Sequence, residues 1–179
     1  IHMGLFRTRD REQWMSFSQP IQTIKTGLFT KTGSIEGNSL HALKGKSVGA
    51  VAGSYQAQYM SVNHPDIRLH AVEDRTKYIL ALMQGDLAGV IEEVPTLEAT
   101  LARFGLTGSV TRRENLFENE VFAGVRKDNT ALLDLINSGL DFIPRERLAK
   151  IEERWITKPE DRFFSEKEGV AYLTSAEKK

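Results

Sequence analysis

A short apolar run that ends in a glycine–serine corner constrains the fold of this chain more than any other stretch. The run spans residues 48–52 (Val-Gly-Ala-Val-Ala), and its lack of polar residues is typical of a strand buried on both faces, as in a parallel sheet. Gly53 allows a sharp turn, and Ser54 is a favourable N-cap for a helix that begins at Tyr55. We therefore predict a strand, a tight turn and a helix whose free N–H groups and positive dipole end face the space beyond the strand. An ordinary β-to-α turn, in which glycine is frequent, has the same residues.

The rest of the chain alternates between strand-like and helix-like stretches. Expected helices begin at capping residues or prolines, near residues 55, 75, 95, 130 and 144. The expected strands span residues 21–30, 48–52, 67–72, 87–91, 106–111 and 121–125, with a polar loop between the last two. This alternation predicts an open α/β sheet whose ligands bind beyond the carboxyl ends of its strands.

Composition excludes several classes of function. Lysine plus arginine and aspartate plus glutamate each total 24, so the net charge gives no indication of a nucleic-acid partner. The absence of cysteine excludes disulfides, a thiolate nucleophile and cysteine-type zinc sites. The four histidines are scattered without metal-ligand spacing, and no phosphate-binding loop or Ser-His-Asp set is present. We expect no metal, no cofactor and no enzymatic activity.

Two adjacent acids follow the apolar strand expected at residues 87–91. If Glu92 and Glu93 share the sheet edge with the Gly53-Ser54 corner, a positive helix end and a carboxylate lie close together. Such a site suits a zwitterion, for example a free amino acid. The alternative is that both acids only complement the dipole of the following helix.

At four places the chain resembles the family 3 periplasmic solute-binding proteins of the amino-acid-binding type. The similar stretches are GLFRTRDREQWMSFSQP (4–20), LKGKSVGAVAGSYQAQYM (43–60), LMQGDLAGVIEEVPTLE (82–98) and VFAGVRKDNTALLDLIN (121–137). They occur in the order that the family shows and cover nearly all of residues 1–156. The resemblance implies a two-lobed clamshell that captures a small solute reversibly between its lobes.

The resemblance also implies roles for individual residues. Arg11 falls where the family's arginine binds the ligand carboxylate, a task that suits a bidentate guanidinium. The alternative is that Arg11, which lies in a run of charged residues, is a solvated surface side chain. Ser54 falls on the corner that meets the same carboxylate from the second lobe. Glu93 falls where an acidic residue pairs with the ligand ammonium, and its neighbour Glu92 is the second candidate for that role.

Two positions depart from the family pattern. Phe6 stands where amino-acid binders often carry serine or threonine, as does Gly4, and Tyr55 replaces a small hydroxyl residue at the corner. These departures weaken the expectation of a standard amino-acid ligand. We expect Phe6 and Tyr55 to line an apolar or aromatic pocket, with Tyr55 as a core residue the alternative.

The resemblance implies a periplasmic binding protein type II-like α/β fold with a nearly complete second lobe and only the end of the first. The expected division is the end of the first lobe (1–30), a connector (31–42), the second lobe (43–125), returning C-terminal helices (126–156) and a linker or extension (157–179). Residues 172–179 resemble the linker that begins a further domain of this type in tandem sensors.

Within the stretch PRERLAKIEERWITKP (144–159), residues 147–155 are similar to the terminal helix of sensor domains in membrane-bound signalling proteins. We therefore expect a periplasmic sensor of a small ligand, an amino acid or small carboxylate, attached to a histidine kinase or diguanylate cyclase and able to form a homodimer. A soluble binding protein of an ABC transporter is the first alternative. A dehydratase-like enzyme, with Glu92 or Glu93 as general acid, is the second.

Overall fold

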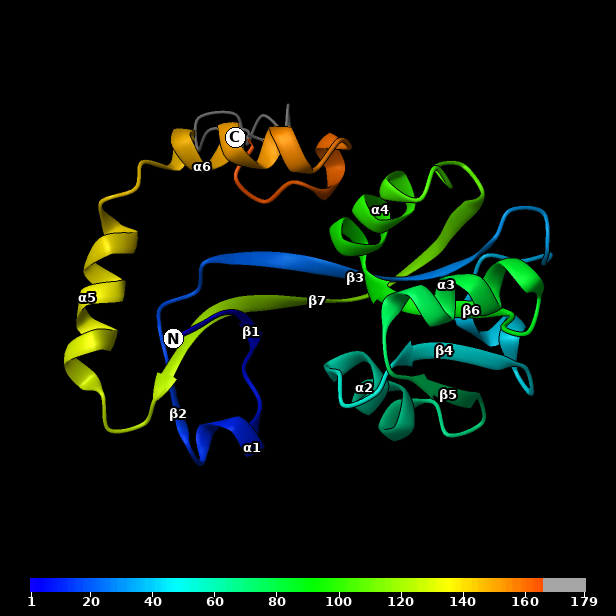
Figure 1. The fold of residues 1–179 in the computed structure, drawn as a ribbon, viewed down its shortest axis with the longest axis horizontal. Helices are drawn as coiled ribbons and strands as arrows, with labels where there is room; N and C mark the ends of the chain where they lie inside the picture. Colours follow the sequence, from blue (N-terminus) through cyan, green and yellow to red (C-terminus); the bar gives the residue numbers. More distant parts are fainter. Residues whose placement is uncertain (166–179) are drawn as a thin grey trace, which may run out of the picture.

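A mixed sheet forms the frame of residues 1–165, the residues that this computed structural model describes (Figure 1). Its strands are β1 (His2–Phe6), β2 (Met15–Phe17), β3 (Gln22–Lys31), β4 (Ser47–Val51), β5 (Arg68–Val72), β6 (Gly89–Glu93) and β7 (Val110–Arg126). They follow the order β1-β7-β3-β6-β4-β5, and β2 also pairs with β7. The predicted α/β sheet is present, but its parallel part is limited to β4, β5 and β6, since β3 pairs antiparallel with both β6 and β7.

The helices of residues 1–165 begin close to the predicted positions, except the first, at residues 9–12, which was not predicted. They are α1 (Arg9–Glu12), α2 (Tyr55–Asn63), α3 (Arg75–Gln84), α4 (Val94–Arg103), α5 (Thr130–Asp141) and α6 (Arg145–Trp155), with the 3-10 turns η1 (Leu40–Leu43) and η2 (Pro159–Asp161). Local capping explains several of these bounds. The Asp74 side chain accepts a hydrogen bond from the backbone of Lys77, and Gly85 ends α3 with φ of +89°.

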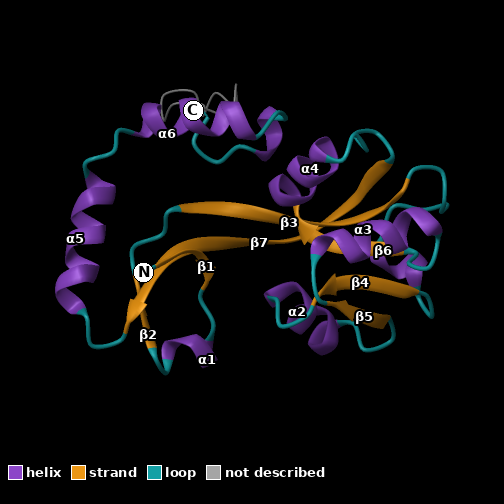
Figure 2. Cartoon of the chain, in the orientation of Figure 1, coloured by secondary structure: helices purple, strands orange, loops and turns teal. Residues whose placement is uncertain are grey.

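Two apolar clusters hold helices against opposite faces of the sheet (Figure 2). One face packs against α3 and α4 through residues that include Val90, Tyr78 and Leu97. The other packs against α2 and η1 through residues that include Ile91, Met60 and Leu43. Because neighbouring residues of a strand point to opposite faces, β6 contributes to both clusters. Val48, Gly49 and Ala50 of β4 are buried between the helix layers as predicted, whereas Val51 is partly exposed and Ala52, expected in the same strand, is exposed in the turn that follows it.

The segment around residues 112–120 corrects one expectation. A polar loop is expected between strands at 106–111 and 121–125, but residues 110–126 form one continuous strand, β7. Its polar residues pair with β3 from Val110 opposite Lys31 to Val121 opposite Gln22. The pairing satisfies the backbone groups of this stretch while most of its side chains stay partly exposed, so a polar sequence is compatible with a strand here.

The long strands β3 and β7 connect two groups of elements (Figure 1). We call β1, α1 and β2 the α1 side, and β4–β6 with α2–α4 the α2 side. The first half of β7 lies in the sheet of the α2 side, and its last residues pair with β1 and β2. A movement of one side relative to the other would therefore require β3 and β7 to bend or twist.

The residues after α6 fold back onto these long strands. The Asp161 carboxylate, 1% exposed, lies 2.7 Å from Nη1 of Arg112 on β7 and 3.4 Å from Nζ of Lys25 on β3. Lys158 reaches Glu98 of α4 at 2.7 Å. The expected linker at 157–179 is thus anchored at its start, and its residues 166–179 lie outside the described part of the chain.

Candidate functional site

The Gly53-Ser54 corner begins α2 as the sequence predicts. Gly53 has φ of +70°, a left-handed conformation that a side chain disfavours. The Ser54 hydroxyl accepts a hydrogen bond from the backbone N–H of Ala57 at 3.1 Å, so Ser54 is the N-cap of α2. The hydroxyl is engaged in this cap, and the helix presents its N-terminal end at the carboxyl end of β4.

Glu93 lies beside the first turn of α2. Its Oε1 accepts a hydrogen bond from Nε2 of Gln56 at 3.3 Å, and its Oε2 accepts one from the Thr96 hydroxyl at 2.9 Å. Desolvation raises the pKa of Glu93, and the negative charge of Glu92 raises it further. The structure therefore brings the Ser54 corner and Glu93 to one edge of the sheet, with the buried Gln56 side chain between them.

Glu92 points to the opposite face of the sheet. The carboxylate is buried and accepts hydrogen bonds from the Tyr78 hydroxyl at 2.7 Å and from Nε of Arg75 at 2.8 Å, both on α3. Burial, followed by the charge of Glu92, raises the pKa of Tyr78 far above its ordinary value. Glu92 thus ties α3 to β6 and does not join the group around Ser54.

Arg11 also lies apart from that group. Its Nη1 donates to the backbone carbonyl of Phe6 at 2.6 Å. The side chain lines a hollow of about 470 Å³ together with Trp14, Met15 and residues of β1 and the end of β7. None of Ser54, Tyr55 or Glu93 lines this hollow.

Aromatic side chains join the α1 side to the α2 side. The buried Phe6 ring lies 5.5 Å from the Tyr55 ring, which lies 5.5 Å from Phe117 of β7, and Phe117 lies 4.3 Å from Tyr59. Phe6 is a buried residue within this aromatic cluster and lines none of the cavities described here, whereas Tyr55 lines one. Sequence reasoning missed Phe117, which falls in the expected polar loop, and Tyr59, although its i, i+4 spacing from Tyr55 places both on one helix face.

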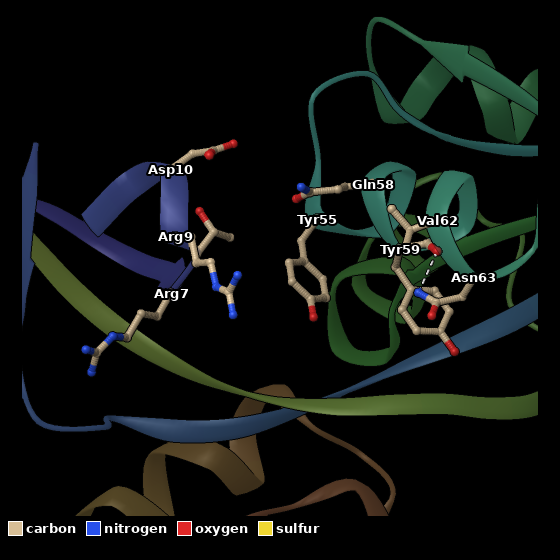
Figure 3. A pocket seen from close by; sticks show the side chains of 9 residues that line it. Arg7, Arg9, Asp10, Tyr55, Gln58, Tyr59, Val62 and Asn63 are labelled. Carbon is tan, nitrogen blue, oxygen red and sulfur yellow. Dashed lines mark hydrogen bonds between the residues drawn. The ribbon is translucent and has the colours of Figure 1, made fainter. Parts of the chain in front are cut away.

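A cavity of about 370 Å³ lies between α1 and α2 (Figure 3). Its α2 wall starts at Tyr55, directly after Ser54, so the cavity borders the corner. Its lining residues are Arg7, Thr8, Arg9 and Asp10 from the α1 side, and Tyr55, Gln58, Tyr59, Val62 and Asn63 from α2. Among the predicted site residues, Tyr55 alone lines it.

Within residues 1–165, no group of three or more His, Cys, Asp or Glu side chains is placed to hold a metal ion. In the same part of the chain, no helix combines the length and apolar character that a membrane span requires.

Comparison with known proteins identifies relatives of this fold. Residues 1–158 match the family described as bacterial extracellular solute-binding proteins, family 3. ABC transporter arginine-binding protein 1 of Escherichia coli (strain K12) is 24% identical over 156 residues, which are 85% of this chain and 63% of the relative. The lysine/arginine/ornithine-binding periplasmic protein of the same organism is 29% identical over 149 residues, covering 78% of this chain and 57% of the relative. The chain spans about three-fifths of the length of these curated relatives.

The solved structure of the periplasmic VFT2 domain of Bordetella pertussis BvgS is similar with a TM-score of 0.75 and 21% identity, over 85% of this chain and 65% of that one. The expected type II periplasmic-binding-protein fold is confirmed for this portion of it. The matched family and its curated relatives are solute-binding proteins and not enzymes.

Proposed function

The chain belongs to the bacterial extracellular solute-binding proteins of family 3, and from this membership we propose that it binds an amino acid or a small carboxylate without catalysing a reaction. An extracytoplasmic location, as for the related binding proteins, accompanies this function. Because the chain spans only part of its curated relatives, the solute and the partners of the whole protein belong to the proposal.

The observation that carries the proposal is the single edge shared by the Ser54 corner and Glu93. Gln56, two residues into α2 from Ser54, donates to the Glu93 carboxylate. A helix N-terminus favours an anionic group and a carboxylate favours an ammonium group, so this edge suits a zwitterion. The raised pKa of Glu93 fits such a role, because a ligand ammonium group would stabilise the charge that burial disfavours.

We further propose that the solute lies between the α1 side and the α2 side, and that these sides correspond to parts of two lobes. The division into a first-lobe end (1–30), connector (31–42), second lobe (43–125) and C-terminal helices (126–156) remains part of this proposal. The cavity between α1 and α2 has one wall from each side, and it borders the Ser54 corner through Tyr55.

A ligand screen of the full-length protein tests this function. We expect at least one amino acid or small carboxylate to raise the melting temperature. Glu93→Gln should weaken the binding of an α-amino acid tenfold or more and leave its deaminated carboxylate analogue nearly unaffected. Glu118→Gln, at an exposed position of β7, is the control. Absence of any stabilising solute, or equal affinities in both variants, contradicts the proposal.

We propose that the domain serves as the sensor of a membrane signalling protein, with an ABC transporter binding protein as the alternative. The terminal-helix pattern of residues 147–155 supports the sensor; the names of the curated relatives support transport. A full-length protein with a membrane-spanning segment and ligand-dependent output is expected for the sensor. Ligand-dependent stimulation of a permease would instead establish transport. The dehydratase alternative has no support among the matched relatives.

A further inference from the structure

The ribbon formed by β3 and β7 is thinnest near its middle. Residues 23–25 of β3 and 118–120 of β7 pair only with each other among the described residues. At one end of this two-stranded part the sheet is widened by β6, and at the other end by β1. Two-stranded ribbons twist more strongly than wider sheets and are only marginally stable alone. A change in the relative placement of the α1 side and the α2 side is therefore expected to twist these residues.

A second connection between the two sides runs outside the ribbon. It begins directly after β2, where the backbone N–H of Gln19 donates to Oδ1 of Asn137 on α5 at 2.9 Å. From α5 the chain continues into α6, which in Figure 1 leads past β3 toward α4. We call residues 156–165, which follow α6, the strap.

The strap is attached to helices at both ends of this path. The buried Glu152 carboxylate of α6 accepts hydrogen bonds from the backbone N–H groups of Phe163 and Phe164 at 2.6 and 2.8 Å. Lys158 pairs with Glu98 of α4, which belongs to the α2 side. The strap therefore links α6 to the α2 side.

Asp161 attaches the strap to the ribbon itself. Its Oδ1 contacts Lys25, which lies in the two-stranded part, and Arg112, which lies where β3 also pairs with β6. The other carboxylate oxygen is buried and forms no hydrogen bond with a described residue, so a single oxygen holds both cations. Because breaking a buried ion pair is costly, a twist that separates either cation from Asp161 is opposed. The strap thus restrains the thin part of the ribbon.

We propose that the strap limits the relative movement of the α1 side and the α2 side, and that its docking is thereby coupled to solute binding. This coupling rests on the proposed function, which places the solute between the two sides, and adds a conformational control to it. A restrained ribbon leaves fewer placements of the two sides for solute binding to exclude, so the docked strap raises the affinity. Coupling of this kind is reciprocal, and the solute in turn stabilises the docked strap.

Hydrogen exchange of the full-length protein tests the reciprocal effect. The probe is an equimolar mixture of the standard L-amino acids with acetate, lactate and succinate. We expect the mixture to slow exchange of the Phe163 and Phe164 amides about fivefold or more, the lower end of typical couplings, although neither residue lines the cavity between α1 and α2. The Leu106 amide, which donates to Leu101 at the end of α4, is the control for a general stabilisation and should slow less.

Variants of the strap test the effect on affinity, measured by calorimetric titration with the same mixture. Lys158→Glu places two acids opposite each other at Glu98 and should weaken binding about fivefold or more. Lys150→Glu, the same charge change at an exposed position of α6, should bind as the wild type does. Asp161→Asn should weaken binding at least as much as Lys158→Glu, and the exposed Lys158 position keeps the test valid if Asp161→Asn does not fold.

Two results overturn the coupling while leaving the proposed function intact. One is a mixture that raises the melting temperature without slowing exchange of the strap amides more than that of Leu106. The other is a Lys158→Glu variant that binds as tightly as Lys150→Glu. A mixture that does not raise the melting temperature of the wild type contradicts the proposed function itself.

Discussion

At the residue scale, adjacent glutamates acquire different surroundings. Glu92 is buried and receives donors from Tyr78 and Arg75 of α3. Glu93 faces α2 and receives neutral donors from Gln56 and Thr96. Consecutive residues of a strand point to opposite faces of the sheet. The two adjacent carboxylates therefore contact different helices. Glu92 contributes to the packing of α3, and Glu93 lies at the candidate site, where it accepts hydrogen bonds from α2 and α4.

The raised pKa of Glu93 predicts a pH-dependent stability difference. Below the ordinary glutamate pKa of 4.5, the carboxyl group is protonated in both the folded and the unfolded chain. Its ionisation then does not change the free energy of unfolding. As the pH rises through the raised value, ionisation costs more in the folded chain and stability falls. In the absence of ligand, the Glu93→Gln variant should therefore have a higher melting temperature than the wild type at pH 7 and nearly the same melting temperature at pH 4.

Thermal melts across that pH range measure the effect. Glu118→Gln should show no comparable trend, because Glu118 is exposed. A Glu93→Gln variant that is less stable than the wild type at pH 7 would show that the hydrogen bonds to Glu93 outweigh its desolvation.

At the element scale, polar contacts as well as apolar packing hold α3 on the sheet. The Tyr78 hydroxyl is fully buried and donates to the Glu92 carboxylate. Tyr78→Phe removes this donor and should destabilise the chain by about 1.5 to 3 kcal/mol, the range for a hydrogen bond to a charged group. Urea unfolding measures the loss.

Tyr59→Phe is the matched control for Tyr78→Phe. Its hydroxyl forms no hydrogen bond with a described residue, while its ring packs on Phe117. Equal unfolding midpoints for the two variants would contradict a stabilising role of the Tyr78–Glu92 contact.

At the scale of the whole molecule, the segment after α6 is attached to both strands that connect the α1 side with the α2 side. Asp161 contacts Lys25 on β3 and Arg112 on β7, and all three side chains are mostly buried. Asp161→Asn leaves two cations without their counter-charge. Loss of one partner of a buried ion pair typically costs about 3 to 5 kcal/mol, and we expect a destabilisation in that range.

Denaturant unfolding of Asp161→Asn against Glu98→Gln tests this attachment. Glu98→Gln disrupts the more exposed pair with Lys158 and should cost at most about 1 kcal/mol. Similar losses in both variants would mean that Asp161 does not secure the segment to the long strands.

The sequence by itself determined the local features of this protein. Local features include the Ser54 cap, the Asp74 cap and the glycine that ends α3, each of which depends on residues within one turn of the helix end. Helix starts were predictable for the same reason, because capping and backbone conformation are short-range effects. The family resemblance, carried by four ordered motifs, predicted the fold class, which the matched family and solved structures confirm.

Tertiary structure alone decided which of these residues meet. The polar stretch of β7 is a strand because β3 pairs with it along its length, and a polar sequence does not reveal a distant partner. The faces of Glu92 and Glu93 depend on strand register, since a shift of one residue exchanges them. Arg9 and Arg11 lie on one charged turn, and only the packing of α1 places Arg9 toward α2 and Arg11 toward Trp14. Contacts between distant segments are set by pairing and packing, which local patterns do not encode.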